Sequence, residues 1–290
     1  MQINEVPYSD NSPSLSKQIA SVARHLILIG VTLLFLLPFY WMIISALKPN
    51  EMVFSDPVQW FPDPIRWENF AEAFNYPGFP FLRFLWNSTF YSTLVTVGTV
   101  ISCAAVGYGF ASLRFPGRNF LFTLTVANLM IPGVVTFIPI FLLFKSLGML
   151  GSYTPLILPS FFGNAFFIFM MRQFFLTMPS ELADAARVDG ANEFVIFWRV
   201  MLPLVQPALI VMAVFTFLWT WHDFFGPLVY LNDQSSYPLS LGLFAFRNRR
   251  TTEWGLLMAG ATLTTLPLMV LFFFAQRYFI EGIKVTGLKV

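Results

Sequence analysis

Six long apolar runs constrain the fold of this chain more than any other feature of its sequence. They span roughly residues 25–47, 86–113, 120–144, 154–171, 204–221 and 255–276. A helix needs about 20 apolar residues to cross the ~30 Å hydrocarbon core of a bilayer, and each run is close to that length or longer. Backbone groups in lipid must be hydrogen-bonded within their own segment, so the runs are expected to be helices. The sequence therefore predicts an all-α integral membrane protein with six transmembrane helices.

The composition agrees with a bilayer as the main solvent. Of the 290 residues, 57% are hydrophobic and only 11% are charged, and the mean hydropathy is +0.67. Soluble domains average about 25% charged residues. A formal net charge of +2 is ordinary for a membrane protein with positive cytoplasmic loops, so nucleic acid is not expected as a partner. The lone cysteine, Cys103, excludes an intrachain disulfide and any multi-cysteine metal site.

Charged residues between the runs indicate which side of the membrane each segment occupies. An even number of spans places both termini on one side. The short loop after the second run carries Arg114 and Arg118 directly beside two spans, and such loops favour the cytoplasm. We therefore expect cytoplasmic termini, with an N-terminal tail at 1–24, a six-helix domain at 25–280 and a C-terminal tail at 281–290.

The chain lacks groups that other classes of membrane protein need. No Asp, Glu, Lys or Arg lies deep in any run, which argues against a proton-coupled carrier but leaves open a sodium site built from carbonyls and hydroxyls. No lysine follows a glycine as a phosphate-binding loop requires, so ATP would have to bind another chain. No serine lies in a nucleophile elbow, so catalysis is not expected, and a membrane enzyme or an assembly subunit is left as a third alternative without a named nucleophile or base.

One polar segment between the fourth and fifth runs has the pattern of a helix, a tight turn and a second helix. Pro179 suits a first helical position, and Gly190 suits the left-handed position that ends a helix. Asn192 can cap the second helix, in which residues 194, 197, 198 and 201 would share one apolar face. An alanine-rich helix flanked by charge fits a partner's groove. From these residues alone, an ordinary amphipathic loop at the membrane surface is the simpler interpretation.

This segment resembles the cytoplasmic EAA loop of the membrane subunits of binding-protein-dependent ABC importers. The family pattern is Glu-Ala-Ala, then a glycine and, further along, Ile-x-Leu-Pro. Here the matching residues are Asp184, Ala185, Ala186, Gly190 and 200–203. Shorter stretches across nearly the whole chain are also similar, among them 45–49, 114–118 and 276–279. The resemblance points to the carbohydrate branch, which includes the smaller membrane subunit of maltose transporters.

The resemblance implies a type I ABC importer permease fold, in which a second homologous permease completes the pore. It implies two ATPase subunits, which bind ATP and Mg²⁺ and receive a coupling loop at 173–203, and an extracytoplasmic solute-binding protein. No cofactor or metal is implied for this chain itself. Transport would follow alternating access across the cytoplasmic membrane of a bacterium or archaeon. The expected coupling residues are Glu181, Asp184, Ala185, Ala186, Asp189, Gly190 and Pro203.

A solute path is expected along the inner faces of the third to sixth spans. Neutral polar groups can replace water on sugar hydroxyls, and aromatic rings can cover the apolar sugar face. The same groups could instead join neighbouring helices. His222 stands where relatives carry asparagine in Trp-Asn-Asp or Trp-Asn-Glu. The expected path residues are Asn128, Asn164, Thr216, Trp221, His222, Asp223 and Thr265.

The resemblance leaves the transported solute open. A saccharide is expected, and within that class an oligosaccharide. Arg247, Arg249 and Arg250 on the outer side leave room for an acidic solute. An autonomous secondary carrier and an ABC permease for a non-sugar solute such as a glycerol phosphate are the alternatives.

Overall fold

The structure is helical almost throughout. The computed structural model describes residues 15–247 and 252–287, so the predicted tails fall partly outside it, as do Arg249 and Arg250. Within these ranges, an isolated bridge between Arg247 and Thr252 is the only β-structure. The predicted all-α class is confirmed. The helices are α1 (Leu15–Ala46), α2 (Glu68–Phe74), α3 (Phe81–Ser112), α4 (Arg118–Ala127), α5 (Gly133–Ser146), α6 (Thr154–Ile157), α7 (Ala165–Leu176), α8 (Ser180–Val188), α9 (Glu193–Val195), α10 (Leu202–Leu204), α11 (Gln206–Trp221), α12 (Phe225–Tyr230), α13 (Leu239–Gly242) and α14 (Trp254–Gly287).

Short 3₁₀ and π-helical stretches lie between these helices. The 3₁₀ turns are η1 (Asn50–Met52), η2 (Asn128–Met130), η3 (Leu158–Phe162), η5 (Gln234–Ser236) and η6 (Leu243–Phe246). The π-helical stretch is η4 (Ile196–Met201).

Four stretches of the described chain are long and apolar enough to cross a membrane. They are Ile19–Ala46, Phe81–Ser112, Thr154–Leu176 and Trp254–Gln276. Two bent pairs bring the number up to six if each counts as one span: Arg118–Met130 with Gly133–Ser146, and Glu193–Leu204 with Gln206–Trp221. The predicted six spans therefore correspond to the upper limit that length and composition allow.

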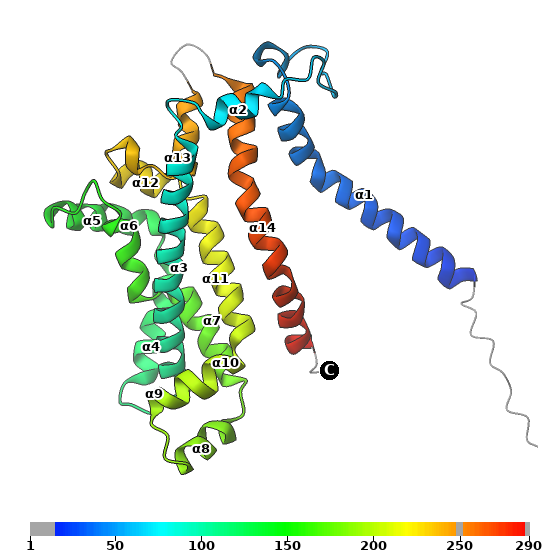
Figure 1. Cartoon of the computed structure of the whole chain (residues 1–290). Coiled ribbons are helices and arrows are strands. Elements are labelled where there is room, and N and C mark those ends of the chain that lie inside the picture. Colours follow the sequence, from blue (N-terminus) through cyan, green and yellow to red (C-terminus); the bar gives the residue numbers. More distant parts are fainter. Residues whose placement is uncertain (1–14, 248–251, 288–290) are drawn as a thin grey trace, which may run out of the picture.

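The third predicted span, 120–144, is sharply bent. The stretches before and after Pro132 meet at 102°. Pro132 lacks a backbone donor and has ψ 132°, and Ile131 before it is extended at ψ 116°. Both conformations interrupt a helix, as expected around a proline. Figure 1 shows the result, with α5 lying across the direction of α3 and α4.

The fifth predicted span also needs a correction at its start. The chain turns by 80° before α11, which begins at Gln206 rather than at the predicted residue 204. Val205, at φ −98° and ψ 14°, separates α10 from α11. The residues just before α11 therefore belong to the loop that leads into the span.

Helix α3 is the centre of the bundle and packs against α7 and α11. The contact with α7 is close at Gly107, where an added Cβ would lie 2.7 Å from Met171 Cβ. One buried cluster fills the bundle around Met171 and Met212, and a second lies at the opposite end around Phe84 and Phe246. The two clusters give the bundle two separately packed ends.

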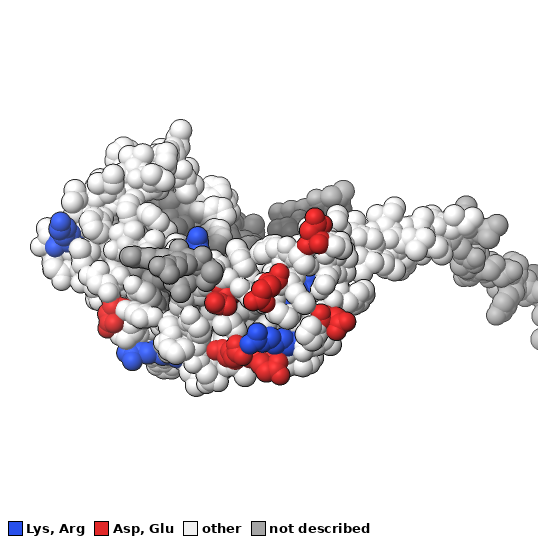
Figure 2. All heavy atoms as spheres, turned by 90° about the horizontal axis from the view of Figure 1, so that it is seen from above, with Lys and Arg blue, Asp and Glu red and all other residues white. Residues whose placement is uncertain are grey.

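Helix α1 leaves the bundle. It packs against α14 near its own C-terminal end, and Figure 1 shows the rest running away from the other helices. Only 6% of its most apolar stretch is buried, although that stretch has a mean hydropathy of 2.4. In Figure 2 it is the arm that leads to the grey N-terminal residues. Lipid or another chain must cover this helix, because exposed apolar surface of this extent is unfavourable in water.

Candidate functional site

The segment between α7 and α11 forms the predicted helix, turn and second helix. Gly190 has φ +84°, in the left-handed region that favours glycine, and ends α8. Asn192 caps α9, since its Oδ1 accepts a hydrogen bond from the backbone N–H of Val195 at 2.9 Å. These local predictions are confirmed. Contrary to the prediction, Pro179 is not the first helical residue. It is the N-cap residue, directly before the first helical residue, Ser180.

The predicted apolar face of the second helix is only partly buried, although the rings of Phe194 and Phe197 both contact that of Trp198. Met201 is buried, but Phe194 is 73% exposed and Trp198 is 57% exposed. The helix passes through η4, whose wider π-helical turns do not keep the 3.6-residue period on which the prediction depended. As a result, two large aromatic side chains project away from the bundle.

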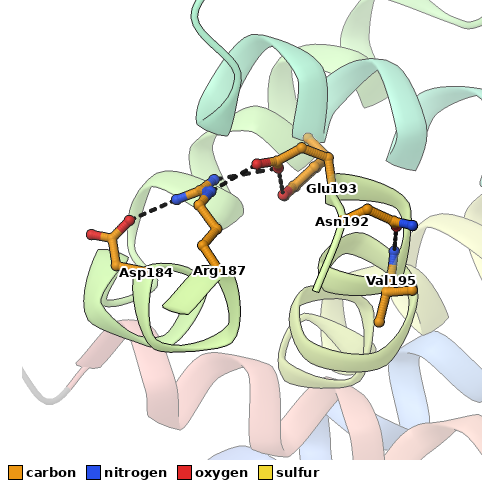
Figure 3. A network of polar contacts seen from close by, with 6 residues as sticks. Asp184, Arg187, Asn192, Glu193 and Val195 are labelled. Carbon is orange, nitrogen blue, oxygen red and sulfur yellow. Dashed lines mark hydrogen bonds and ion pairs between the residues drawn. The ribbon is translucent and has the colours of Figure 1, made fainter. Parts of the chain in front are cut away.

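A charged network joins the two sides of the turn (Figure 3). Arg187 donates from Nη1 to Asp184 Oδ1 at 2.6 Å and from Nε to Glu193 Oε1 at 2.7 Å. These contacts raise the pKa of Arg187, mainly through Glu193, and the hydrogen bond from Arg187 lowers the pKa of Glu193. The hydroxyl of Tyr108 on α3 donates to Glu193 Oε2 at 2.9 Å. The network therefore fixes the turn and ties it to the central helix.

Most of the predicted coupling residues lie together on the outside of α8. In Figure 1 this helix lies at the end of the molecule opposite α2. Ala186 is half-buried and Ala183 is buried against the bundle, whereas Val188 is 88% exposed. Pro203 is separate from the others, at the far end of the second helix. The remaining predicted coupling residues are exposed, namely Glu181, Asp184, Ala185, Asp189 and Gly190.

Three of the predicted path residues hold neighbouring parts of the chain together. Asn164 caps α7 by accepting from the backbone N–H groups of residues 166 and 167. Trp221 is buried, and its Nε1 donates to Thr264 O on α14 at 3.3 Å. Asp223 accepts from the hydroxyl of Tyr91 at 2.8 Å and from the N–H of residue 226. Each of these contacts uses hydrogen-bonding capacity that a solute would otherwise use.

The other four predicted path residues differ in their surroundings. Asn128 and His222 are exposed. Thr265 donates to the carbonyl of residue 261 one turn back along α14. Thr216 is buried on α11, and its Oγ1 has no hydrogen-bond partner among the residues that the structure describes. The role of the seven residues in solute passage stays a prediction.

Two contacts at the site had no signal in the sequence. Tyr108 lies 85 residues before Glu193, and Tyr91 lies 132 residues before Asp223. Both tyrosines lie on α3 within apolar runs, where tyrosine is an ordinary packing residue. Only the three-dimensional arrangement of α3 against the loops identifies them as partners of the two carboxylates.

Comparison with known proteins relates this geometry to membrane transport. The chain is 33% identical to the arabinooligosaccharides transport system permease protein of Bacillus subtilis (strain 168) over 281 residues, covering 96% of this chain and 99% of that one. It is also 33% identical to the sn-glycerol-3-phosphate transport system permease protein of Yersinia enterocolitica, covering 89% and 94%.

A solved structure has the same fold. It is the crystal structure of a bacterial ABC transporter involved in the import of the acidic polysaccharide alginate, with a TM-score of 0.79 at 22% identity, covering 94% of this chain and all of that one. Residues 101–285 match the family described as "Binding-protein-dependent transport system inner membrane component". The chain therefore belongs to this family, the membrane permease subunits of ABC importers.

Proposed function

We propose that this permease forms half of a translocation pore and passes an oligosaccharide inward by alternating access. The proposal depends mainly on one observation: this chain has 33% sequence identity, over nearly the full length of both chains, to a permease named for arabinooligosaccharides. A second such permease, from Halalkalibacterium halodurans, is 35% identical over 256 residues. Neutral hydroxyl and amide groups in the spans agree with a solute whose hydroxyls need hydrogen bonds.

A glycerol phosphate is the second candidate solute. The permease of Yersinia enterocolitica that is named for sn-glycerol-3-phosphate is 33% identical over 265 residues. Two relatives with the same sequence identity to this chain are therefore named for different solutes. The solute of this chain needs a direct measurement.

Uptake by the reconstituted importer tests the solute class. The permease, its partner permease, the ATPase subunits and the binding protein are placed in vesicles, and uptake and ATP hydrolysis are measured with arabino-oligosaccharides, malto-oligosaccharides and sn-glycerol-3-phosphate. We expect an oligosaccharide to be taken up and to stimulate hydrolysis. Stimulation by glycerol phosphate alone would assign the second candidate, and uptake by this chain without ATPase subunits would assign an autonomous carrier.

The partners proposed for this chain follow from its two unfilled surfaces. Few residues of this chain cover α1, so its apolar surface is suited to contact with a second permease as well as with lipid. The exposed end at α8 suits docking into one of two ATPase subunits, which would hold ATP and Mg²⁺. A solute-binding protein would dock at the opposite end. On this assignment α1 begins on the cytoplasmic side and α14 ends there (Figure 1), which supports the proposal that both termini are cytoplasmic.

Force transfer through α8 requires a stiff loop with an apolar contact surface. Arg187 and its two carboxylate partners brace the turn, and Val188 and Trp198 offer apolar side chains to a partner. ATP-driven closure of the ATPase subunits would move the loop as a unit and reorient the spans.

Two left-handed glycines allow a matched test of this role. Gly190→Val combined with Ala186→Glu should reduce uptake at least tenfold while ATP hydrolysis continues, because both changes alter the docking helix. Gly148 has φ +67° and, like Gly190, nothing within 4 Å of an added Cβ, but it lies at the end of α5. Gly148→Val therefore imposes similar backbone strain without touching α8. Wild-type uptake from the well-expressed double variant would refute the coupling role.

A further inference from the structure

Two hollows share the loop that joins α3 to α4, and the larger of them extends from this loop to the coupling loop. The larger has a volume of about 1060 Å³ and the smaller about 300 Å³, and both are lined by Arg114, Phe115 and Arg118. Ligand pockets typically measure ~300–1,000 Å³, so the larger hollow has room for more than bound water. The predicted solute-path residues do not line this space, and of the predicted coupling residues only Asp184 does.

The hollows carry unbalanced positive charge. Of the three arginines that line the larger one, Arg187 is neutralised by Asp184 and Glu193. Neither Arg114 nor Arg118 takes part in an ion pair with any residue in the described ranges. Arg118 donates from Nη1 to the carbonyl of residue 113 at 3.1 Å, which leaves its other donors free for a ligand. The guanidinium group binds phosphate with paired hydrogen bonds, so two such groups favour a phosphate-bearing anion.

The walls of the larger hollow indicate where that phosphate comes from. Apolar side chains of the α3–α4 loop and of the C-terminal end of α7 line it beside the arginines, namely Leu113, Phe115, Phe175, Leu176 and Met178. The α3–α4 loop also joins two membrane-spanning segments directly. Basic pockets between spans on the cytoplasmic side are suited to anionic lipid headgroups. A ligand with a charged head and an apolar body satisfies both kinds of wall, whereas free phosphate satisfies only the arginines.

We propose that this hollow is a binding site for an anionic phospholipid, with Arg114 and Arg118 holding the headgroup phosphate. Its floor includes Ala183, Asp184 and Arg187 of the coupling loop. A bound lipid therefore contacts the loop and helps to fix its position. The inference uses the cytoplasmic placement of α8 from the proposed function. Lipid binding is measured without transport, so a failure of the lipid site can be distinguished from a failure of the proposed transport function.

The test measures lipid retention by the complete importer in mixed vesicles of phosphatidylglycerol and phosphatidylcholine. After extraction, lipids that stay bound are counted by native mass spectrometry. The wild type should retain phosphatidylglycerol selectively. Arg114→Gln and Arg118→Gln should each lower that retention about fivefold, from the usual worth of one arginine near an anionic surface. The paired Arg→Lys variants keep the charge and should lose less. Arg24→Gln removes an exposed cation from α1, outside the hollow, and should change nothing.

Four outcomes would overturn the proposal. The first is equal retention of phosphatidylglycerol by the wild type and by Arg114→Gln combined with Arg118→Gln. The second is an equal loss in Arg24→Gln. Displacement of the lipid by millimolar inorganic phosphate would assign the site to a soluble anion. Loss of the ATPase subunits from the pocket variants on size-exclusion chromatography would assign it to a protein interface.

Discussion

The end of this permease around α2 and the end around α8 are stabilised in different ways; following the proposed orientation, we call them the outer end and the cytoplasmic end. At the outer end, side chains join segments far apart in the sequence. Asn69 donates to two carbonyls at the end of α1, and Asn87 donates to the carbonyls of residues 235 and 237. Beneath them Phe79, Phe84 and Phe246 are fully buried and pack ring against ring. The outer end therefore completes its own core. Figure 2, which views this end, shows several of its acidic side chains close to basic ones.

At the cytoplasmic end, the polar contacts of the coupling loop are mostly local. Arg187 bonds to residues three and six positions away, and Ala191 closes the turn by donating to the carbonyl of residue 186. Tyr108 adds a hydrogen bond from the bundle. Val188 and Trp198 remain outside any core. The loop has a fixed shape but an unfilled apolar surface. This difference indicates that the core of the outer end is self-sufficient, although its surface still exposes Phe61 and Trp67, while the loop at the cytoplasmic end is shaped for a partner.

Truncating one aromatic side chain at each end gives the largest expected contrast. Phe84→Ala should destabilise the protein by about 3–5 kcal/mol, because it leaves a cavity in the outer cluster. Trp198→Ala removes an exposed ring and should change the unfolding free energy by less than about 0.5 kcal/mol. Thermal unfolding of the purified permease measures both. Uptake should still fall in Trp198→Ala if the ring meets an ATPase subunit. Equal loss of stability in the two variants would contradict the comparison.

Glycine substitutions at the two ends should destabilise the protein for different physical reasons, and not only by different amounts. At Gly242 an added Cβ would lie 2.2 Å from Phe84 Cδ2, and overpacking of this kind costs about 1–3 kcal/mol. At Gly190 there is open space, and the cost of a side chain is the left-handed backbone, roughly 1–2 kcal/mol.

Asparagine separates the two mechanisms, because it tolerates a left-handed backbone but is larger than alanine. Gly190→Asn should unfold close to the wild-type temperature, whereas Gly242→Asn should be less stable than Gly242→Ala. The comparison fails if asparagine is tolerated at 242 or is worse than alanine at 190.

The sequence predicted helices well wherever one apolar run forms one helix. The second run was expected at 86–113 and α3 spans Phe81–Ser112, while the sixth was expected from 255 and α14 begins at Trp254. The direction of the third run could not be predicted from hydropathy, because hydropathy counts apolar residues and does not record the direction of the chain. The chain remains apolar through Pro132 while it turns by 102°.

The candidate site divides in the same way between local and distant information. The turn at Gly190 and the cap at Asn192 depend on neighbouring residues, and both were predictable. The solute path was chosen by residue type, and no local pattern shows that Asn164 caps a helix or that Trp221 bonds to α14. Those roles depend on how helices meet, which the sequence does not state.

The smallest expected effect concerns one exposed ion pair at each end. Arg66 and Glu72 at the outer end are 3.0 Å apart, and Arg187 and Glu193 at the cytoplasmic end are 2.7 Å apart with similar exposure. Exposed pairs contribute about 0.2–1 kcal/mol, because water screens them. The second pair has two hydrogen bonds, and Tyr108 holds its carboxylate, so its coupling energy should be the larger of the two. Double-mutant cycles with Arg→Gln and Glu→Gln in thermal unfolding measure both energies.

If the coupling loop is braced for force transfer, only the cytoplasmic cycle should also change the ratio of solute transported to ATP hydrolysed. A change of that ratio in the outer cycle as well would mean that both ends transmit force, and the contrast between a self-sufficient and a partner-dependent end would then be wrong.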